Sequence, residues 1–168
     1  MSNLSVCQVF LELGRNRMII TVYYLGPIDH ITEGTMGYLA GWGSDEYYGK
    51  FTEELHSVQM PIISNEECKK AFASTADFTE VHVCAGHIDA GKDGCRGDSG
   101  AGLITNVAGN MILSGIMSGG HRCGGPGVYT RVLKFAQWID EVIKDEESAQ
   151  ENLRKKREAR HARLQLEL

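Results

Sequence analysis

The chain has 168 residues, of which 42% are apolar and 23% charged, and its formal net charge is −5. A chain of this length and composition can bury a core of ordinary size, which excludes a largely disordered protein. The negative charge argues against nucleic acid as a partner. No apolar run approaches the ~18 residues of a membrane-spanning helix, which argues against a membrane. The 20 glycines and 3 prolines indicate many tight turns, as in β-rich folds.

The first 36 residues carry few structural signals. Residues 1–17 are partly apolar but lack the basic segment that begins a secretory signal. Residues 18–25 (MIITVYYL) are β-branched and aromatic, which predicts a strand, and the following Gly26-Pro27 predicts a turn. We therefore treat residues 1–33 as an atypical or truncated N-terminal segment.

From Gly37 onward, short apolar segments alternate with glycine-containing turns. Strands of this length and spacing are typical of an antiparallel barrel or sandwich. The sequence therefore predicts an all-β fold with strands near residues 37–42, 54–61, 81–86, 101–105, 111–118 and 127–132.

Two helices are predicted after or between these strands. Ser64 can cap a short helix, with Glu67 three residues later at the capping-box position. A second helix is expected over residues 132–144, because apolar residues recur there with the spacing of one buried helix face. Residues 145–168 are rich in both acidic and basic side chains, which predicts a solvated helix or a disordered tail. The basic run 154–163 within them gives a weaker case for an acidic partner.

Residues 93–100 (DGCRGDSG) carry the strongest functional signal. A serine on a tight, glycine-rich loop can expose its hydroxyl, as Ser99 would here. The backbone N–H groups of Gly97 and Ser99 could converge on one point and stabilise a developing oxyanion. This pattern points to a nucleophilic serine.

Two further motifs flank this segment. Gly41-Trp42-Gly43 precedes it, and the stretch PGVYTRV at residues 126–132 follows it. In order and spacing, the three motifs resemble the trypsin-like (chymotrypsin-fold, peptidase family S1) serine peptidases, so we assign residues 34–144 to this family. The resemblance implies a six-stranded antiparallel Greek-key barrel, the second half of a trypsin-like double barrel, followed by a C-terminal α-helix. It also implies serine endopeptidase activity, no cofactor and an extracellular location.

The resemblance assigns roles to individual residues. Ser99 matches the nucleophile, and Gly97 and Ser99 match the oxyanion hole. Asp93 matches the floor of the pocket that receives the substrate side chain before the cut, where a carboxylate selects Lys or Arg. The other pocket positions are Ser118, Gly120 and Gly127.

Asp98 has two interpretations. The resemblance makes it the carboxylate that receives the new N-terminal ammonium when a zymogen is cut. From the residues alone, a turn carboxylate that accepts local N–H groups is the simpler interpretation.

The five cysteines show no zinc-ligand spacing, so no metal site is predicted. The resemblance implies two disulfides, Cys68–Cys84 and Cys95–Cys123. A third disulfide of the family would join the positions of Gly37 and Thr105, and neither position is a cysteine in this chain. Cys7 has no assigned partner.

The family's general base and the carboxylate that orients it lie on the first barrel, but only 41 residues precede Trp42. No matching histidine or aspartate motif occurs in them. The neighbouring pair Asp29-His30 does not have the family's spacing to Ser99. The remaining histidines fit surface or core positions better than a catalytic one: His56, His82, His87, His121 and His161. We therefore expect a catalytically incomplete chain.

Three interpretations remain open. The chain is a protease whose first barrel is missing, a non-catalytic homologue that acts as a protein-binding module, or a fragment that does not fold stably. The third would follow if the barrel face that contacts the first barrel in this family were apolar and exposed to water. The expected partner is accordingly a protein or peptide substrate with Lys or Arg before the cut, or a protein partner if the chain is inactive.

Overall fold

The structure is a computed structural model that describes residues 4–13, 16–25, 31–72, 77–88, 93–120 and 123–166. The chain divides into two compact units, residues 1–134 and 135–168. The first unit contains all the described strands, and the second contains the whole of the long helix α2 (Ala136–Leu166).

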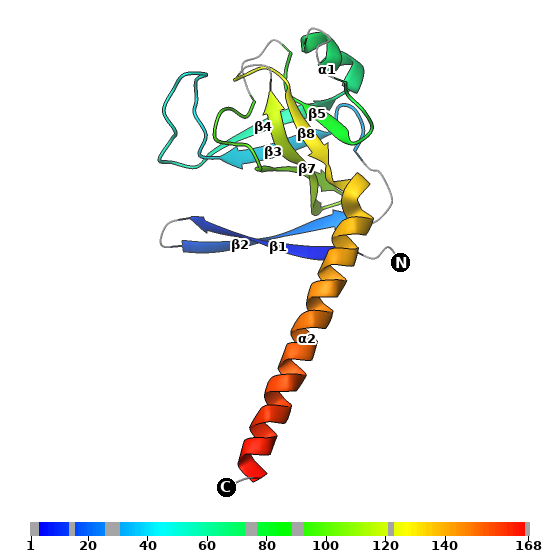
Figure 1. Cartoon of the computed structure of the whole chain (residues 1–168). Helices are drawn as coiled ribbons and strands as arrows, with labels where there is room; N and C mark the ends of the chain where they lie inside the picture. Colours follow the sequence, from blue (N-terminus) through cyan, green and yellow to red (C-terminus); the bar gives the residue numbers. More distant parts are fainter. Residues whose placement is uncertain are drawn as a thin grey trace. The chain divides into compact units, whose positions relative to one another are not determined.

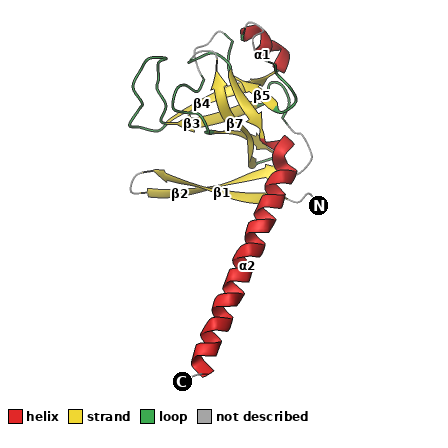
Figure 2. Cartoon of the chain, viewed as in Figure 1, coloured by secondary structure: helices red, strands yellow, loops and turns green. Residues whose placement is uncertain are grey.

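The first unit contains a closed barrel of six antiparallel strands (Figures 1 and 2). Their order is β7-β6-β3-β4-β5-β8, and the barrel closes because β7 also pairs with β8. This confirms the predicted fold class, and each predicted strand overlaps an observed one. The strands are β3 (Met36–Gly41), β4 (His56–Ile63), β5 (His82–Ala85), β6 (Gly102–Val107), β7 (Asn110–Gly120) and β8 (Gly127–Arg131).

A β-hairpin precedes the barrel. Strand β2 (Asn16–Leu25) contains the strand predicted over residues 18–25, whereas β1 (Leu4–Leu13) was not predicted. The two strands pair antiparallel along their whole length. A single parallel pairing, Tyr23 with Ile112, joins β2 to β7.

The barrel interior is filled by alternate residues of its strands, as the two-residue period of a strand requires. Along β3, for example, Gly37 and Leu39 are buried while their neighbours are more exposed. The most buried large side chains include Met60, Leu103 and Tyr129, each 0% exposed. A single apolar core therefore stabilises the barrel that carries the loops described below.

The two positions of the family's third disulfide face each other across β3 and β6, because Gly37 pairs with Thr105. No sulfur is present, and other contacts occupy the space. A Cβ added to Gly37 would lie 2.7 Å from Cδ1 of Leu103. The buried Thr105 hydroxyl instead bonds to the Ser114 hydroxyl at 2.6 Å, which satisfies both groups.

Both predicted disulfides are present. Cys68–Cys84 joins α1 (Asn65–Ala71) to β5, and Cys95–Cys123 joins the Ser99 loop to the segment before β8, with Cα separations of 6.2 and 4.7 Å. Ser64 caps α1 as predicted by accepting the Glu67 N–H at 3.1 Å. In the chain-entropy model, loops of these lengths contribute roughly 3–3.5 kcal/mol each. The side chain of Cys7 lies outside the described part.

The second unit is almost entirely helix. A 3₁₀ turn over Val132–Phe135 leads into α2, which runs from Ala136 to Leu166. The helix predicted to reach residue 144 therefore continues through the charged segment, which takes the solvated-helix form of the two alternatives. Among the described residues, no helix combines the length and apolar character needed to cross a membrane.

Candidate active site

Ser99 lies on a loop whose shape depends on two glycines. Gly97 and Gly100 have φ angles of +98° and +88°, in the left-handed region that side chains other than glycine rarely adopt. Ser99 between them is exposed. The loop is held from outside by the N–H of Ser44, which donates to the carbonyl of Arg96 at 2.9 Å. The serine hydroxyl is therefore presented to solvent on a fixed backbone.

The Asp98 carboxylate is bound by two distant parts of the main chain. Oδ1 accepts the N–H of Gly43 at 2.8 Å, and Oδ2 accepts the N–H of Cys95 at 2.9 Å. A Cβ added to Gly41 or Gly43 would overlap the carboxylate. Only glycine at positions 41 and 43 therefore leaves room for the Asp98 carboxylate against the backbone of the Gly-Trp-Gly motif. One of the two hydrogen bonds to Asp98 is local to the turn, from Cys95, and the other comes from Gly43, 55 positions away; the ammonium-receiving role of Asp98 stays a prediction.

Asp93 is half-buried, and its Oδ2 atom is buried without a hydrogen-bond partner among the described residues. Burial raises the pKa of this carboxyl to about 7, against the opposing effects of the Gly94 N–H and the Tyr129 hydroxyl. That hydroxyl donates to Oδ1 at 3.1 Å. Burial and the nearby Asp93 charge also raise the pKa of the Tyr129 phenol, so it remains a donor. The Tyr129 hydroxyl thus orients the Asp93 carboxylate, but no cationic group among the described residues neutralises its charge.

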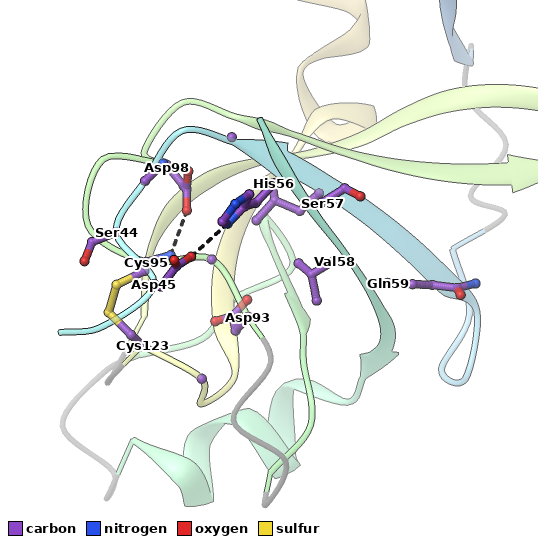
Figure 3. Close-up of a pocket in the computed structure, with 15 residues that line it drawn as sticks. Ser44, Asp45, His56, Ser57, Val58, Gln59, Asp93, Cys95, Asp98 and Cys123 are labelled. Carbon is purple, nitrogen blue, oxygen red and sulfur yellow. Dashed lines mark hydrogen bonds and ion pairs between the residues drawn. A yellow bond between two sulfur atoms is a disulfide. The ribbon is translucent and has the colours of Figure 1, made fainter. Parts of the chain in front are cut away.

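A cavity of about 500 Å³ lies between the Ser99 loop and strands β3 and β4 (Figure 3). Asp93 and Asp98 both line it, together with an Asp45–His56 pair. The His56 Nδ1 and Asp45 Oδ1 atoms are 2.9 Å apart, and both side chains are more than half exposed. Three carboxylates, those of Asp45, Asp93 and Asp98, therefore line the cavity.

A family model described as Trypsin matches residues 19–139, which is most of the chain. The chain belongs to the trypsin-like serine peptidases. Relatives include the proclotting enzyme of Tachypleus tridentatus, 42% identical over 108 residues, and the venom serine protease Bi-VSP of Bombus ignitus, 43% identical over 111 residues. A third is the submandibular glandular kallikrein-3 of Rattus norvegicus, 40% identical over 117 residues.

These matches cover 62%, 63% and 67% of this chain, but only 29%, 30% and 59% of the respective relatives. The chain therefore spans less than two thirds of the length of these trypsin-like relatives. Its matched part is the part that contains the barrel and the Ser99 loop.

The other positions predicted for the pocket lie at one end of the β7–β8 pair and do not line the cavity described above. Gly120 pairs directly with Gly127, and a register shift lies between Met117 and Gly119. Ser118 and Gly120 are exposed, whereas Gly127 is buried against Asp93. A Cβ on Gly127 would lie 2.8 Å from Oδ2 of Asp93, so glycine keeps the approach to that oxygen open. The structure thus brings Asp93, Ser118, Gly120 and Gly127 to one end of the barrel.

Two of the described histidines are hydrogen-bonded to groups other than Ser99. His56 bonds to Asp45, and His82 Nδ1 accepts the Thr79 N–H at 3.1 Å. His30 and His121 lie outside the described residues, as does the side chain of His161. Within the described ranges, no hydrogen bond to the Ser99 hydroxyl is found, and no three His, Cys, Asp or Glu side chains are grouped as metal ligands.

Sequence reasoning missed three contacts of the trypsin-like site. Tyr129 lies inside a motif that was recognised, yet its bond to Asp93 spans 36 positions and leaves no local pattern. The Asp45–His56 pair was not considered, since its members are 11 residues apart. Phe51 lies against Gly97, which is predicted to belong to the oxyanion hole: a Cβ on Gly97 would be 2.9 Å from its Cε1 atom, and Phe51 is 65% exposed.

Proposed function

We propose that this chain carries the nucleophile and the primary specificity pocket of an extracellular serine endopeptidase that cleaves proteins or peptides after Lys or Arg. The observation that carries the proposal is the Oδ2 atom of Asp93, which is buried and accepts no hydrogen bond from the described residues. A buried carboxylate without a counter-charge is costly. A Lys or Arg side chain entering from the Gly127 side would supply that counter-charge, so cation binding would be coupled to the ionisation of Asp93.

The proposed nucleophile is Ser99, with the N–H groups of Gly97 and Ser99 as oxyanion donors. Its exposure and the left-handed conformation of Gly97 support these roles. A serine hydroxyl is a weak nucleophile until a neighbouring base accepts its proton. No hydrogen bond joins the Ser99 hydroxyl to a histidine of the described residues, where His56 and His82 bond to Asp45 and Thr79. We therefore infer that Ser99 needs a base from outside the described residues, and we expect low activity without it.

The two disulfides support the extracellular location, because such bonds persist mainly in oxidising compartments. A second function, a non-catalytic protein-binding module, is favoured by one observation: Ser99 is exposed and has no hydrogen-bonded base among the described residues. Binding of a protein partner would then survive Ser99→Ala, whereas peptide hydrolysis would not.

The specificity pocket is tested with an aromatic amidine, a planar cation that resembles the head of an arginine side chain. Binding to the purified chain is measured by fluorescence titration at pH 8. We expect equal affinity for wild type and Ser99→Ala, and at least tenfold weaker binding to Asp93→Asn. The matched control is Asp45→Asn, which removes another carboxylate from the same cavity and should retain binding. Equal affinity for wild type and Asp93→Asn would contradict the proposed specificity.

Activation of Ser99 is tested separately, by labelling with an organophosphonate and by hydrolysis of a Lys or Arg chromogenic peptide. Ser99→Ala is the control in both assays. We expect little labelling and little turnover. Loss of a base alone lowers turnover on the order of 10⁶-fold in enzymes of this mechanism. Rapid turnover abolished by Ser99→Ala would show that a base does reach the serine.

A further inference from the structure

Helix α2 is separated into an acidic half and a basic half. Residues 140–151 contain six acidic residues and one lysine, a net charge of −5, while residues 152–163 contain six basic residues and one glutamate, a net charge of +5. The helix has 31 residues, so it is about 46 Å long. Two copies laid side by side in opposite directions would place the acidic half of each beside the basic half of the other.

Apolar side chains are exposed on one face of the same helix. Trp138, Val142 and Leu153 are 62%, 43% and 56% exposed. At 100° per residue these three side chains lie within about 60° of one another around the helix axis. Exposed apolar side chains gathered on one face of a polar helix indicate a surface that is covered by a partner.

Four charges near this face have no ion-pair partner among the described residues. The ion pairs of this part of the helix join Glu151, Arg154, Lys155 and Glu158 to one another. Asp145, Glu146, Lys156 and Arg157 do not take part in them. In an antiparallel pair of helices centred on Glu151, Asp145 would face Arg157 of the other copy and Glu146 would face Lys156. The unpaired charges therefore fit a second copy of the same helix.

We propose that α2 is a self-association surface through which two copies of this chain form an antiparallel helix pair. The charge distribution sets the direction, because a parallel pair would bring acid against acid and base against base. The exposed apolar face supplies the contact between the helices, with the two Leu153 side chains near its centre. This proposal is independent of the chemistry of Ser99.

The test uses the full chain and two charge-reversed variants. One carries Asp145→Lys with Glu146→Lys, and the other carries Lys156→Glu with Arg157→Glu. The mass in solution is measured by sedimentation equilibrium at low salt, with circular dichroism to establish that each variant retains its helix. Non-reducing gels exclude dimers linked through Cys7. We expect wild type to be dimeric and each variant alone to associate at least tenfold more weakly.

Two further measurements decide between orientations and partners. An equimolar mixture of the two variants should form a mixed dimer. The variant with all four reversals should again dimerise with itself. Loss in the two charge-reversed variants followed by this rescue is specific to the antiparallel arrangement, because in a parallel pair each position faces itself and the reversals would change nothing. Wild type that stays monomeric at micromolar concentration and low salt would overturn the proposal, leaving the basic half as a solvated surface or a site for an acidic partner. Failure of the four-fold variant to dimerise would also overturn it.

Discussion

The barrel and helix α2 differ in how far apart in sequence their interacting residues lie. In the barrel, the Asp98–Gly43 and Asp93–Tyr129 bonds span 55 and 36 positions. In α2, the ion pairs of Glu151 join residues three and four positions apart. The barrel can therefore bury and orient single carboxylates, which is what a specificity pocket needs, whereas the charges of the helix remain solvated. A substitution should have a large effect in the first region and a small one in the second.

The largest expected effect is the pH dependence contributed by Asp93. Its pKa is raised from 3.8 to about 7 in the folded chain, so between these pH values the folded state holds a proton that the unfolded state has lost. Stability should therefore fall as pH rises from about 4 to about 7. Relative to Asp93→Asn, wild type should lose on the order of 2–4 kcal/mol across this window.

This difference is measured by urea unfolding of wild type and Asp93→Asn from pH 4 to pH 8. Asp77→Asn, an exposed carboxylate on the same unit, is the control and should follow wild type. If the wild-type and Asp93→Asn curves ran parallel through the whole range, Asp93 would not be an isolated buried carboxylate.

The next effect is steric and tests the role of the Gly-Trp-Gly motif. In Gly43→Ala the new methyl group would overlap the Asp98 carboxylate and disturb the bond to Oδ1. We expect a loss of about 1–3 kcal/mol in the free energy of unfolding. Gly119→Ala is a matched control, since a Cβ there meets no atom within 4 Å, and it should be close to neutral. Equal losses in the two variants would remove the steric explanation.

A smaller effect is expected at the Thr105–Ser114 hydroxyl pair. Thr105→Val leaves the Ser114 hydroxyl buried without its 2.6 Å partner, and Ser114→Ala does the converse. Each single change should cost about 1–2 kcal/mol, and the double variant should cost less than the sum of the two. A double-mutant cycle by thermal unfolding measures the coupling, and strict additivity would show that the two hydroxyls act independently.

The smallest effect is expected in α2. Hydrogen bonding to Arg154 is the largest cause that lowers the pKa of Glu151, with a further contribution from Lys155. Because a lowered carboxyl pKa stabilises the folded form above it, helix content should decrease slightly as pH falls through that pKa. Circular dichroism of wild type and Glu151→Gln follows this change, and the variant should lack it. Barrel unfolding should be the same in both proteins; a shift there would mean that the helix and barrel are energetically coupled.

Local signals in the sequence predicted an antiparallel barrel or sandwich, and the family resemblance implied the six-stranded barrel. Alternating apolar residues and glycine turns mark the six strands, and Ser64 marks the start of α1. The strand β1 was missed, since residues 4–13 mix apolar and polar residues without a clear period. The continuation of α2 beyond residue 144 was left open for a related reason: a charged segment with few apolar residues is compatible with a helix or with a disordered tail.

By itself, the sequence determined the fold class, both disulfide pairings through the family resemblance, and the loop that carries Ser99. Only the tertiary structure decided which groups surround the carboxylates of this loop: Gly43 and Cys95 at Asp98, and Tyr129 at Asp93. The physical reason is that strand period and turn chemistry act between neighbours in the chain, and so leave a pattern in the sequence. The solvation and hydrogen bonding of a buried carboxylate depend instead on groups that barrel closure brings together from distant strands and loops.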